Sequence, residues 1–197
     1  MNEEDVFILE RDTLKRPYTA EVAEFCSPFS CRDEDLDEFF AKDAMYYDSE
    51  LLGRTYAWID LANPRNIMAM VTLSNDSVKA KYIANSARNR IQRGIVNAKR
   101  GINYPAFGVS SSYRGKGLNI GSKILDYIKE WFRSIDNKTG CRFIVVDAYN
   151  NDRTLNFYKK NGFKLLYKTE DEEREFLELD ADEPLKTRFM FFDLKQK

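Results

Sequence analysis

The first part of the chain shows two spacings of apolar residues, and they predict different elements. The apolar run at 6–9 predicts a short strand. After Asp33, a residue type that caps helix N-termini, apolar residues recur three or four positions apart, as on one face of a helix. These residues are Leu36, Phe39, Phe40, Ala44 and Tyr47. We therefore predict an amphipathic helix whose polar residues face solvent, namely Asp35, Asp37, Glu38 and Lys42.

Further along the chain, β-rich runs alternate with helical patterns. The runs at 56–60 and 67–73 flank an Asn-Pro turn signal and predict a hairpin. A strand is predicted at 106–110, followed by a glycine-rich loop at 111–121 and an amphipathic helix at 122–135.

The last part of the chain continues this alternation. Strands are expected at 142–147, 163–167 and 188–194. A short helix is expected to begin after Asn151 or Asp152 and to end at Lys160, because Asn161-Gly162 is typical of a left-handed helix C-terminus. The chain has neither repeats nor a Pro-rich linker. The order of elements therefore predicts one domain of mixed α/β layers around one sheet.

Composition narrows the available chemistry. The chain has 197 residues, 43% of them hydrophobic, which is enough for one domain with a core. It has no histidine, which excludes Ser-His-Asp and Cys-His triads, histidine metal ligands and imidazole acid-base catalysis. Three cysteines (Cys26, Cys31 and Cys141) do not form a set of zinc ligands and fit reduced thiols in the cytoplasm. We therefore expect no metal.

The net charge of −1 conceals two segments of opposite charge. Residues 77–104 contain seven basic side chains and no acid, whereas residues 169–183 contain nine acids and only Arg174 as a base. We interpret both as insertions into the domain, the basic one as one or two surface helices. The basic insertion has two interpretations: a contact for nucleic-acid phosphates or an acidic peptide, or a solvated face opposite the acidic insertion.

The N-terminus gives no targeting signal. Residues 1–11 contain four acids, and no stretch of the chain approaches 18 apolar residues. We therefore expect neither secretion nor contact with a membrane.

A glycine-rich segment between a predicted strand and a predicted helix is the main candidate for a binding site. Its sequence is Tyr113-Arg114-Gly115-Lys116-Gly117-Leu118-Asn119-Ile120-Gly121-Ser122. Glycines let the backbone approach a ligand, and free amides converge at the positive end of the helix dipole. This suits phosphate or pyrophosphate; a tight turn without a ligand is the alternative. A Walker loop is excluded, because no Gly-Lys-Ser/Thr follows a four-residue gap.

The same glycines also suggest a dinucleotide site. Gly115-x-Gly117-x-x-x-Gly121 resembles a dinucleotide fingerprint, with Asp147 at the end of the next strand as the ribose-binding acid. However, Gly115 lies five residues beyond the predicted strand, and Asp147 lies beyond the usual distance of about 20 residues. Too little chain follows for a doubly wound sheet. This alternative is therefore disfavoured.

Three linked segments resemble the GNAT superfamily of acyl-CoA-dependent N-acetyltransferases. They are the strand Phe107-Gly108-Val109-Ser110, the loop Arg114-Gly115-Lys116-Gly117 with its helix, and Asn151-x-x-Thr154-x-x-Phe157-Tyr158-x-x-Asn161-Gly162-Phe163. The sequence departs from the family where Thr154 replaces Ala, where Asn119 replaces a small residue, and where a two-residue insertion displaces Gly121-Ser122. The resemblance covers about 104–167. It implies a three-layer α+β fold with a mixed, largely antiparallel six- to seven-stranded sheet and helices on both faces.

The resemblance also implies a cosubstrate and a mechanism. A primary amine attacks the thioester of acetyl-CoA, a backbone amide near Val109 or Ser110 polarises the carbonyl, and Tyr158 protonates the departing thiolate. The alternative for Tyr158 is a packing aromatic. Asn151 either touches the pantetheine arm or caps its helix. The implied cofactor-binding residues are Val109, Ser110, Arg114, Gly115, Lys116, Gly117, Leu118, Asn119, Ile120, Gly121, Ser122 and Asn151.

No general base is identified. Asp60, Asp147 and Glu50 lie near strand ends, but each also fits a solvated surface acid. Water is the alternative acceptor of the proton that the amine loses.

Segments upstream are similar to the toxin-type branch of the superfamily, which acetylates the amino group of aminoacyl-tRNA. They are Phe29-Ser30-Cys31-Arg32-Asp33-Glu34-Asp35-Leu36-Asp37-Glu38-Phe39-Phe40, Gly53-Arg54-Thr55-Tyr56 and Val71-Thr72-Leu73-Ser74. In that branch a Cys-Gly motif precedes the Leu-Asp helix, and here Arg32 replaces the glycine. A shared helix without a shared substrate is the alternative.

We therefore expect a cytoplasmic N-acetyltransferase that moves an acetyl group from acetyl-CoA to a primary amine. The acceptor is left open between a small molecule, a peptide and a tRNA-linked amine, and a homodimer is one assembly left open. The competing hypothesis is a catalytically inactive binding module on the same fold, suggested by the altered loop at Leu118-Asn119.

Overall fold

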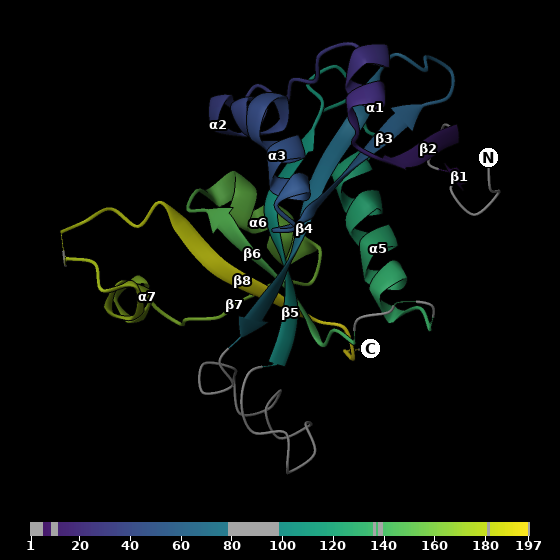
Figure 1. The fold of residues 1–197 in the computed structure, drawn as a ribbon. Coiled ribbons are helices and arrows are strands. Elements are labelled where there is room, and N and C mark those ends of the chain that lie inside the picture. Colours follow the sequence, from purple (N-terminus) through teal and green to yellow (C-terminus); the bar gives the residue numbers. More distant parts are fainter. Residues whose placement is uncertain are drawn as a thin grey trace. The chain divides into compact units, whose positions relative to one another are not determined.

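The computed structural model describes residues 6–8, 12–78, 99–135, 137, 140–180 and 182–196. Contacts divide the chain into two compact units. The first consists of Met1–Ser74 and Tyr104–Ile128, and the second of Asn75–Asn103 and Lys129–Lys197. Three long elements contribute residues to both units: β4 (Ile67–Val78), β5 (Lys99–Val109) and α5 (Ile120–Arg133) (Figure 1).

The strands of the first unit follow the order β1-β2-β3-β4-β5. β1 (Val6–Ile8), β2 (Asp12–Pro17), β3 (Arg54–Asp60) and β4 pair antiparallel, each with the next. The predicted first strand and the predicted hairpin, which is formed by β3 and β4, are confirmed. β2 and the short helix that follows it, α1 (Ala20–Phe25), have no counterpart in the sequence prediction.

The predicted helix after Asp33 is present as three consecutive segments: α2 (Glu34–Glu38), a π-helical turn (Phe39–Asp43) and α3 (Ala44–Ser49). Oδ1 of Asp33 accepts a hydrogen bond from the Leu36 amide at 3.1 Å and so caps α2. Phe40 and Ala44 are buried, as the spacing predicts. Asp37 differs from its prediction, because its carboxylate binds the preceding loop instead of only facing solvent.

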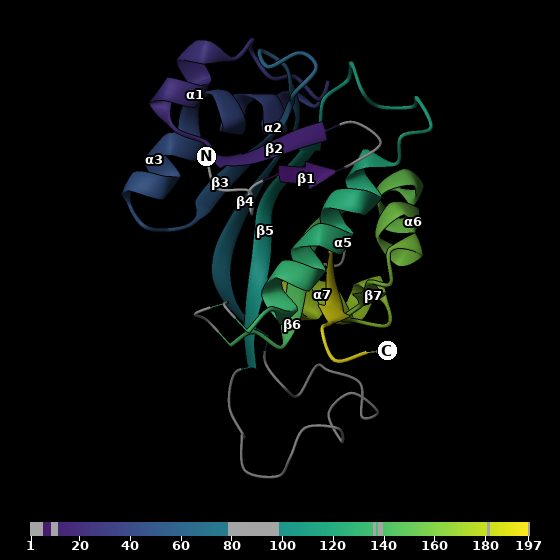
Figure 2. The same cartoon turned by 90° about the vertical axis from the view of Figure 1, so that its right-hand side faces the viewer.

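Neighbouring residues of β3 point to opposite faces of the strand, which gives the first unit two apolar faces. Ala57 and Ile59 belong to a buried cluster with side chains of α1 and of the helical segments after Asp33. The Trp58 ring points the other way and contacts the Tyr127 ring of α5 edge to face, with centroids 6.1 Å apart. Helices therefore cover both faces of the first unit's strands, as Figure 2 shows for α1–α3 and α5. This is the predicted three-layer arrangement.

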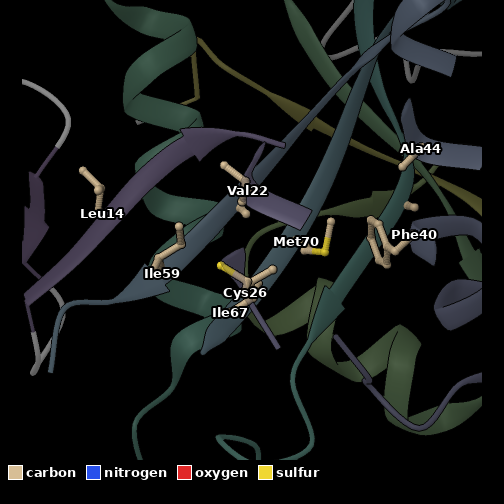
Figure 3. Close-up of a cluster of buried hydrophobic side chains, with 10 residues drawn as sticks. Leu14, Val22, Cys26, Phe40, Ala44, Ile59, Ile67 and Met70 are labelled. Atoms are coloured by element: carbon tan, nitrogen blue, oxygen red, sulfur yellow. The ribbon is translucent and has the colours of Figure 1, made fainter. Parts of the chain in front are cut away.

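The cluster on the α1 side forms the core of this face. Its buried members are Leu14, Val22, Cys26, Phe40, Ala44, Ala57, Ile59, Ile67, Met70 and Ala106. Figure 3 shows how they gather between the strands and the helices, with Cys26 at the end of α1 and Ile67 on β4. Burial of each large apolar side chain in such a cluster contributes about 1.5–3 kcal/mol to folding.

The second unit contains the strand order β5-β6-β8-β7. β5 pairs in parallel with β6 (Phe143–Tyr149), whereas β8 (Thr187–Asp193) pairs antiparallel with both β6 and β7 (Lys164–Leu165). The fold class, mixed and largely antiparallel α+β, is confirmed. The described residues contain eight strands, where six to seven were expected.

The predicted helix between β6 and β7 is α6 (Asp152–Lys160). Gly162, with a φ of +83°, adopts the left-handed conformation expected after its C-terminus. In the ranges that the structure describes, no helix has the length and the apolar character needed to cross a membrane.

The basic segment differs from its prediction where the structure describes it. Residues 77–78 complete β4 and residues 99–104 belong to β5, so both ends of the segment are strands and not helices. The parallel pairing of residues 101–103 with residues 143–145 outweighs the weak helical periodicity of the sequence. Residues 79–98 lie outside the described residues.

The acidic segment contains a helix that the sequence prediction did not include, α7 (Glu170–Leu177). Thr169 caps it, since its Oγ1 accepts a hydrogen bond from the Glu172 amide at 3.2 Å. Glu173 is buried, and its Oε2 lies 2.6 Å from Nε of Arg188 on β8. The segment is therefore attached to β8 through a buried ion pair, while most of its other acids are exposed.

Candidate active site

The loop between β5 and α5, residues 110–119, has a backbone suited to binding an anion. Gly115 and Gly117 have φ angles of +77° and +72°, in the left-handed region that favours glycine. A Cβ at either position would meet no atom within 4 Å, so the backbone conformation, and not a lack of space, requires glycine. Asn119 has a φ of +50°, which asparagine adopts more readily than most other residues. Asn119, which stands where the GNAT superfamily has a small residue, is therefore compatible with the backbone of this loop.

Unpaired backbone amides follow these glycines. The amides of residues 117–122 have no hydrogen-bond acceptor among the described residues, whereas the Lys123 amide donates to Asn119 O at 3.1 Å. The positive end of the dipole of a 14-residue helix lies at this point. Residues 109–125 contain no acid, and their basic residues are Arg114, Lys116 and Lys123. The loop can therefore bind a phosphate or pyrophosphate group.

The residues that enter this loop are held by backbone hydrogen bonds. The Ser110 amide donates to Met68 O at 2.8 Å, and the Ser111 amide donates to Ser30 O at 2.9 Å. The Ser110 amide is therefore already engaged. Of the two amides expected to polarise a thioester carbonyl, that of Val109 becomes the candidate.

Asp60 is not a surface acid. It lies at the end of β3 with no exposed surface, and its carboxylate accepts hydrogen bonds from the Tyr113 hydroxyl at 2.8 Å and from the Ala62 amide at 2.9 Å. This corrects the expectation of a solvated acid and removes Asp60 as a candidate base. Asp147 and Glu50 are exposed, as expected of surface acids.

A turn at Cys31 and Arg32 is held by a carboxylate. Arg32 has a φ of +58°, at the position where the toxin-type branch has glycine. The carboxylate of Asp37 accepts hydrogen bonds from the Cys31 amide and from the Ser30 hydroxyl, each at 2.7 Å. Desolvation by partial burial acts to raise the pKa of Asp37. The hydrogen bonds from Ser30 and Cys31 outweigh it, so the pKa of Asp37 is lowered.

The Cys31 thiol is not activated. Burial, and next the hydrogen bond and the charge of Asp37, raise the pKa of Cys31 to about 12. The thiol is therefore protonated at neutral pH, which argues against a nucleophilic role.

Tyr158 lies in the last turn of α6, in the second unit, and is 6% exposed. Its ring contacts those of Phe157 and Phe163, with centroids 5.1 Å and 5.3 Å apart. No described residue forms a hydrogen bond with its hydroxyl. Burial raises the pKa of Tyr158 well above its ordinary value of 10. The residue thus combines a packed ring with a protonated hydroxyl that can donate to a ligand.

Asn151 lies at the other end of α6. Its Oδ1 accepts a hydrogen bond from the Thr154 amide at 2.9 Å. Asn151 therefore caps the helix, which is one of the two roles expected for it from the sequence. Its Nδ2 has no acceptor among the described residues and can donate to a ligand.

Sequence reasoning missed the roles of three residues near this site: Asp37, Asp60 and Tyr113. The position of Tyr113 directly before Arg114-Gly115 is a signal that could have indicated a buried anchor. Nothing in the sequence distinguishes Asp37 or Asp60 from a solvated acid. Among the described residues, no cluster of His, Cys, Asp or Glu side chains could hold a metal ion.

The structure described above is a mixed α+β fold with a loop suited to an anion between a strand and a helix. Residues 80–165 match the family model of the acetyltransferase (GNAT) domain. The resemblance to the GNAT superfamily inferred from the sequence is therefore confirmed. Comparison with curated protein sequences gives no significant match.

Solved structures are similar over nearly the whole chain. AtaT complexed with acetyl-methionyl-tRNAfMet is 16% identical, with a TM-score of 0.64 over 93% of this chain and 96% of that chain. AtaTR bound with AcCoA is 17% identical, with a TM-score of 0.64 over 93% of this chain and 95% of that chain. A tyrosine-to-phenylalanine mutant of KacT is 14% identical, with a TM-score of 0.66 over 93% of this chain and 95% of that chain. At these identities the likeness establishes the fold, and it includes proteins described as toxins.

Proposed function

We propose that this protein is an N-acetyltransferase that transfers the acetyl group of acetyl-CoA to a primary amine. The observation that carries the proposal is the set of unpaired amides at residues 117–122, next to Gly115 and Gly117 in left-handed conformations. This arrangement suits the pyrophosphate of coenzyme A. The match of residues 80–165 to the acetyltransferase (GNAT) domain supports the proposal, as does the similarity to AtaTR bound with AcCoA.

The β5–α5 loop would hold the acyl donor through its pyrophosphate. The amides of Gly117, Leu118, Asn119, Ile120, Gly121 and Ser122 would donate hydrogen bonds to phosphate oxygens. The exposed side chains of Arg114 and Lys116 would balance the phosphate charge, while Nη2 of Arg114 also donates a hydrogen bond to Val109 O at 3.1 Å. Asn151 would donate from Nδ2 to the pantetheine arm.

The transfer itself requires neither histidine nor a covalent enzyme intermediate. The amine nitrogen attacks the carbonyl carbon, so that a C–N bond forms and the C–S bond breaks. The Val109 amide would stabilise the charge that develops on the carbonyl oxygen. The Tyr158 hydroxyl would donate a hydrogen bond, and then its proton, to the departing sulfur, and would regain a proton from water. Water would accept the proton lost by the amine, since Asp60 is engaged with Tyr113.

A finer proposal is that the acceptor is the amino group of an aminoacyl-tRNA. AtaT, which has a similar fold, is complexed with acetyl-methionyl-tRNAfMet. The seven basic side chains of residues 77–104 would contact RNA phosphates. Binding through them would weaken steeply with salt, because each neutralised phosphate releases a counterion. A small amine and a peptide are the competing acceptors.

Mass spectrometry of products distinguishes these acceptors. The full chain is incubated with acetyl-CoA and either small polyamines, a lysine-containing peptide or aminoacyl-tRNA. We expect acetylated aminoacyl-tRNA as the main product.

A charge-reversed variant at Arg88, Arg90, Arg93, Lys99 and Arg100 should lose this product but retain binding of acetyl-CoA. If tRNA binding is insensitive to salt and no acetylated aminoacyl-tRNA forms, the tRNA proposal is wrong. Binding of acetyl-CoA without any product supports the inactive binding module.

We further propose that the protein acts in the reducing cytoplasm, because its three cysteines are free. A mass measurement in solution would show whether it forms a homodimer.

A further inference from the structure

Asp60 closes the turn between β3 and β4. Its Oδ1 accepts a hydrogen bond from the Ala62 amide at 2.9 Å, and its Oδ2 lies 3.4 Å from Nδ2 of Asn63. The Asn63 amide donates to Asp60 O at 3.0 Å. The carboxylate is therefore fixed in a buried position by the turn that follows it.

Tyr113 joins this fixed carboxylate to the β5–α5 loop. Its hydroxyl donates to Oδ2 of Asp60 at 2.8 Å, and the side chain is 8% exposed. The residues around it, Ser112 and 114–117, are all exposed. Tyr113 is thus the one buried side chain of residues 112–117, and it precedes directly the segment that carries Arg114, Gly115 and Gly117.

Such an anchor matters because the hydrogen bonds that the loop makes to itself lie at its start, where the amides of Tyr113 and Arg114 both donate to Ser110 O at 3.0 Å. Gly115 and Gly117 adopt left-handed conformations here, but without a ligand the glycine backbone can also adopt many other conformations. Fixing one residue's backbone costs about 1–2 kcal/mol of conformational entropy, which a ligand must offset if the loop is not already ordered. A hydrogen bond to an ionised carboxylate is stronger than one between neutral groups.

We propose that Asp60 and Tyr113 form a positioning pair that orders the loop for the pyrophosphate of the acyl donor. The pair acts on the amides of residues 117–122 without touching the ligand. This inference rests on the proposed function, since it assumes that the loop binds acetyl-CoA.

The test compares two tyrosine hydroxyls of the first unit. Tyr113→Phe removes the hydrogen bond to Asp60. Tyr127→Phe is the matched control, because the Tyr127 hydroxyl accepts a hydrogen bond from Nζ of Lys15 at 2.9 Å, away from the loop. Calorimetry with acetyl-CoA should show Kd about tenfold higher for Tyr113→Phe, whereas Kd for Tyr127→Phe should stay within twofold. At saturating acetyl-CoA, kcat of Tyr113→Phe should be unchanged.

A truncated donor separates positioning from general destabilisation. S-acetylpantetheine lacks the pyrophosphate, so wild type and Tyr113→Phe should use it at the same rate. A lower rate of Tyr113→Phe with this donor too would overturn the inference, because a general loss of structure affects both donors. Asp60→Asn keeps a hydrogen-bond acceptor for Tyr113 but removes the charge, and it should raise Kd for acetyl-CoA about threefold. This variant replaces Tyr113→Phe in the test if Tyr113→Phe does not fold.

The possible failures can be told apart. If wild type binds acetyl-CoA and Tyr113→Phe binds it equally well, the positioning pair is wrong and the proposed function stands. If wild type does not bind acetyl-CoA, both are wrong.

Discussion

The amide of Cys31 donates a hydrogen bond to Oδ1 of Asp37 at 2.7 Å, and this contact helps hold the next residue, Arg32, in a left-handed conformation. A residue with a Cβ is strained there by about 1–2 kcal/mol relative to glycine. Arg32 therefore adopts a backbone conformation that glycine would adopt without this strain. Asp37, four residues beyond the cap of α2, compensates by accepting hydrogen bonds from Ser30 and Cys31.

Arg32→Gly should accordingly stabilise the protein. Relief of strain exceeds the extra entropy of glycine in the unfolded chain, so we expect a gain of up to about 1 kcal/mol in the free energy of unfolding. Arg32→Ala keeps the strain and should change stability little. Urea denaturation of both variants measures the difference. A destabilised Arg32→Gly variant would show that the Arg32 side chain contributes more than its backbone costs.

Gly117→Ala should damage the loop through its backbone alone. The φ of +72° strains alanine by about 1–2 kcal/mol, although nothing lies within 4 Å of the added Cβ. The loop should shift to other conformations and Kd for acetyl-CoA should rise at least about tenfold. Gly140→Ala is the control, since its Cβ also meets nothing and no positive φ constrains it. Equal Kd values for the two variants would argue against a role of the left-handed conformation.

Tyr158→Phe should lower kcat by roughly ten- to a thousandfold and leave Kd for acetyl-CoA nearly unchanged. The ring contacts are kept, and only the proton donor is lost. Because burial raises the pKa of Tyr158 above 10, wild-type activity should show no loss from its deprotonation between pH 7 and about pH 10. Tyr167→Phe, at another buried tyrosine of the second unit, is the control. A Tyr158→Phe turnover within twofold of wild type would exclude this residue as the acid.

Glu173→Gln should destabilise the second unit. Glu173 is 2% exposed, and Nε of Arg188 lies 2.6 Å from its Oε2. Removing one charge of a buried pair typically costs about 3–5 kcal/mol. Here Oε1 of Glu170, 3.8 Å from Nη1 of Arg188, offsets part of the remaining charge, so we expect a loss of about 3 kcal/mol. Glu175→Gln, at an exposed position of the same helix, should change stability by less than about 0.5 kcal/mol. Thermal unfolding of the two variants provides the comparison, and equal Tm values would mean that this ion pair does not anchor α7.

The sequence predicted best those parts of the fold whose information is local. The loop at Arg114-Gly115-Lys116-Gly117 and the helix that carries Tyr158 follow from glycines, caps and periodicity within about fifteen residues. Helix α7 also had a local signal, because Thr169-x-x-Glu172 is the spacing of a capping box, but the density of acids obscured it.

Other parts depend on contacts between distant residues and could not be predicted in the same way. β2 contains only one buried apolar residue, Leu14, and is a strand because it pairs with β1 and β3. The first residues of β5 look helical in sequence but pair with β6. Asp60 and Tyr113 are 53 positions apart, so nothing local indicates their hydrogen bond.

The most direct test of the account is calorimetric titration of the full chain with acetyl-CoA. We expect saturable binding of one acetyl-CoA per chain. This binding should be competed by coenzyme A, and it should weaken markedly in Gly117→Ala but not in Gly140→Ala. Absence of binding up to millimolar acetyl-CoA would contradict the proposal that the amides of residues 117–122 hold the pyrophosphate of an acyl donor.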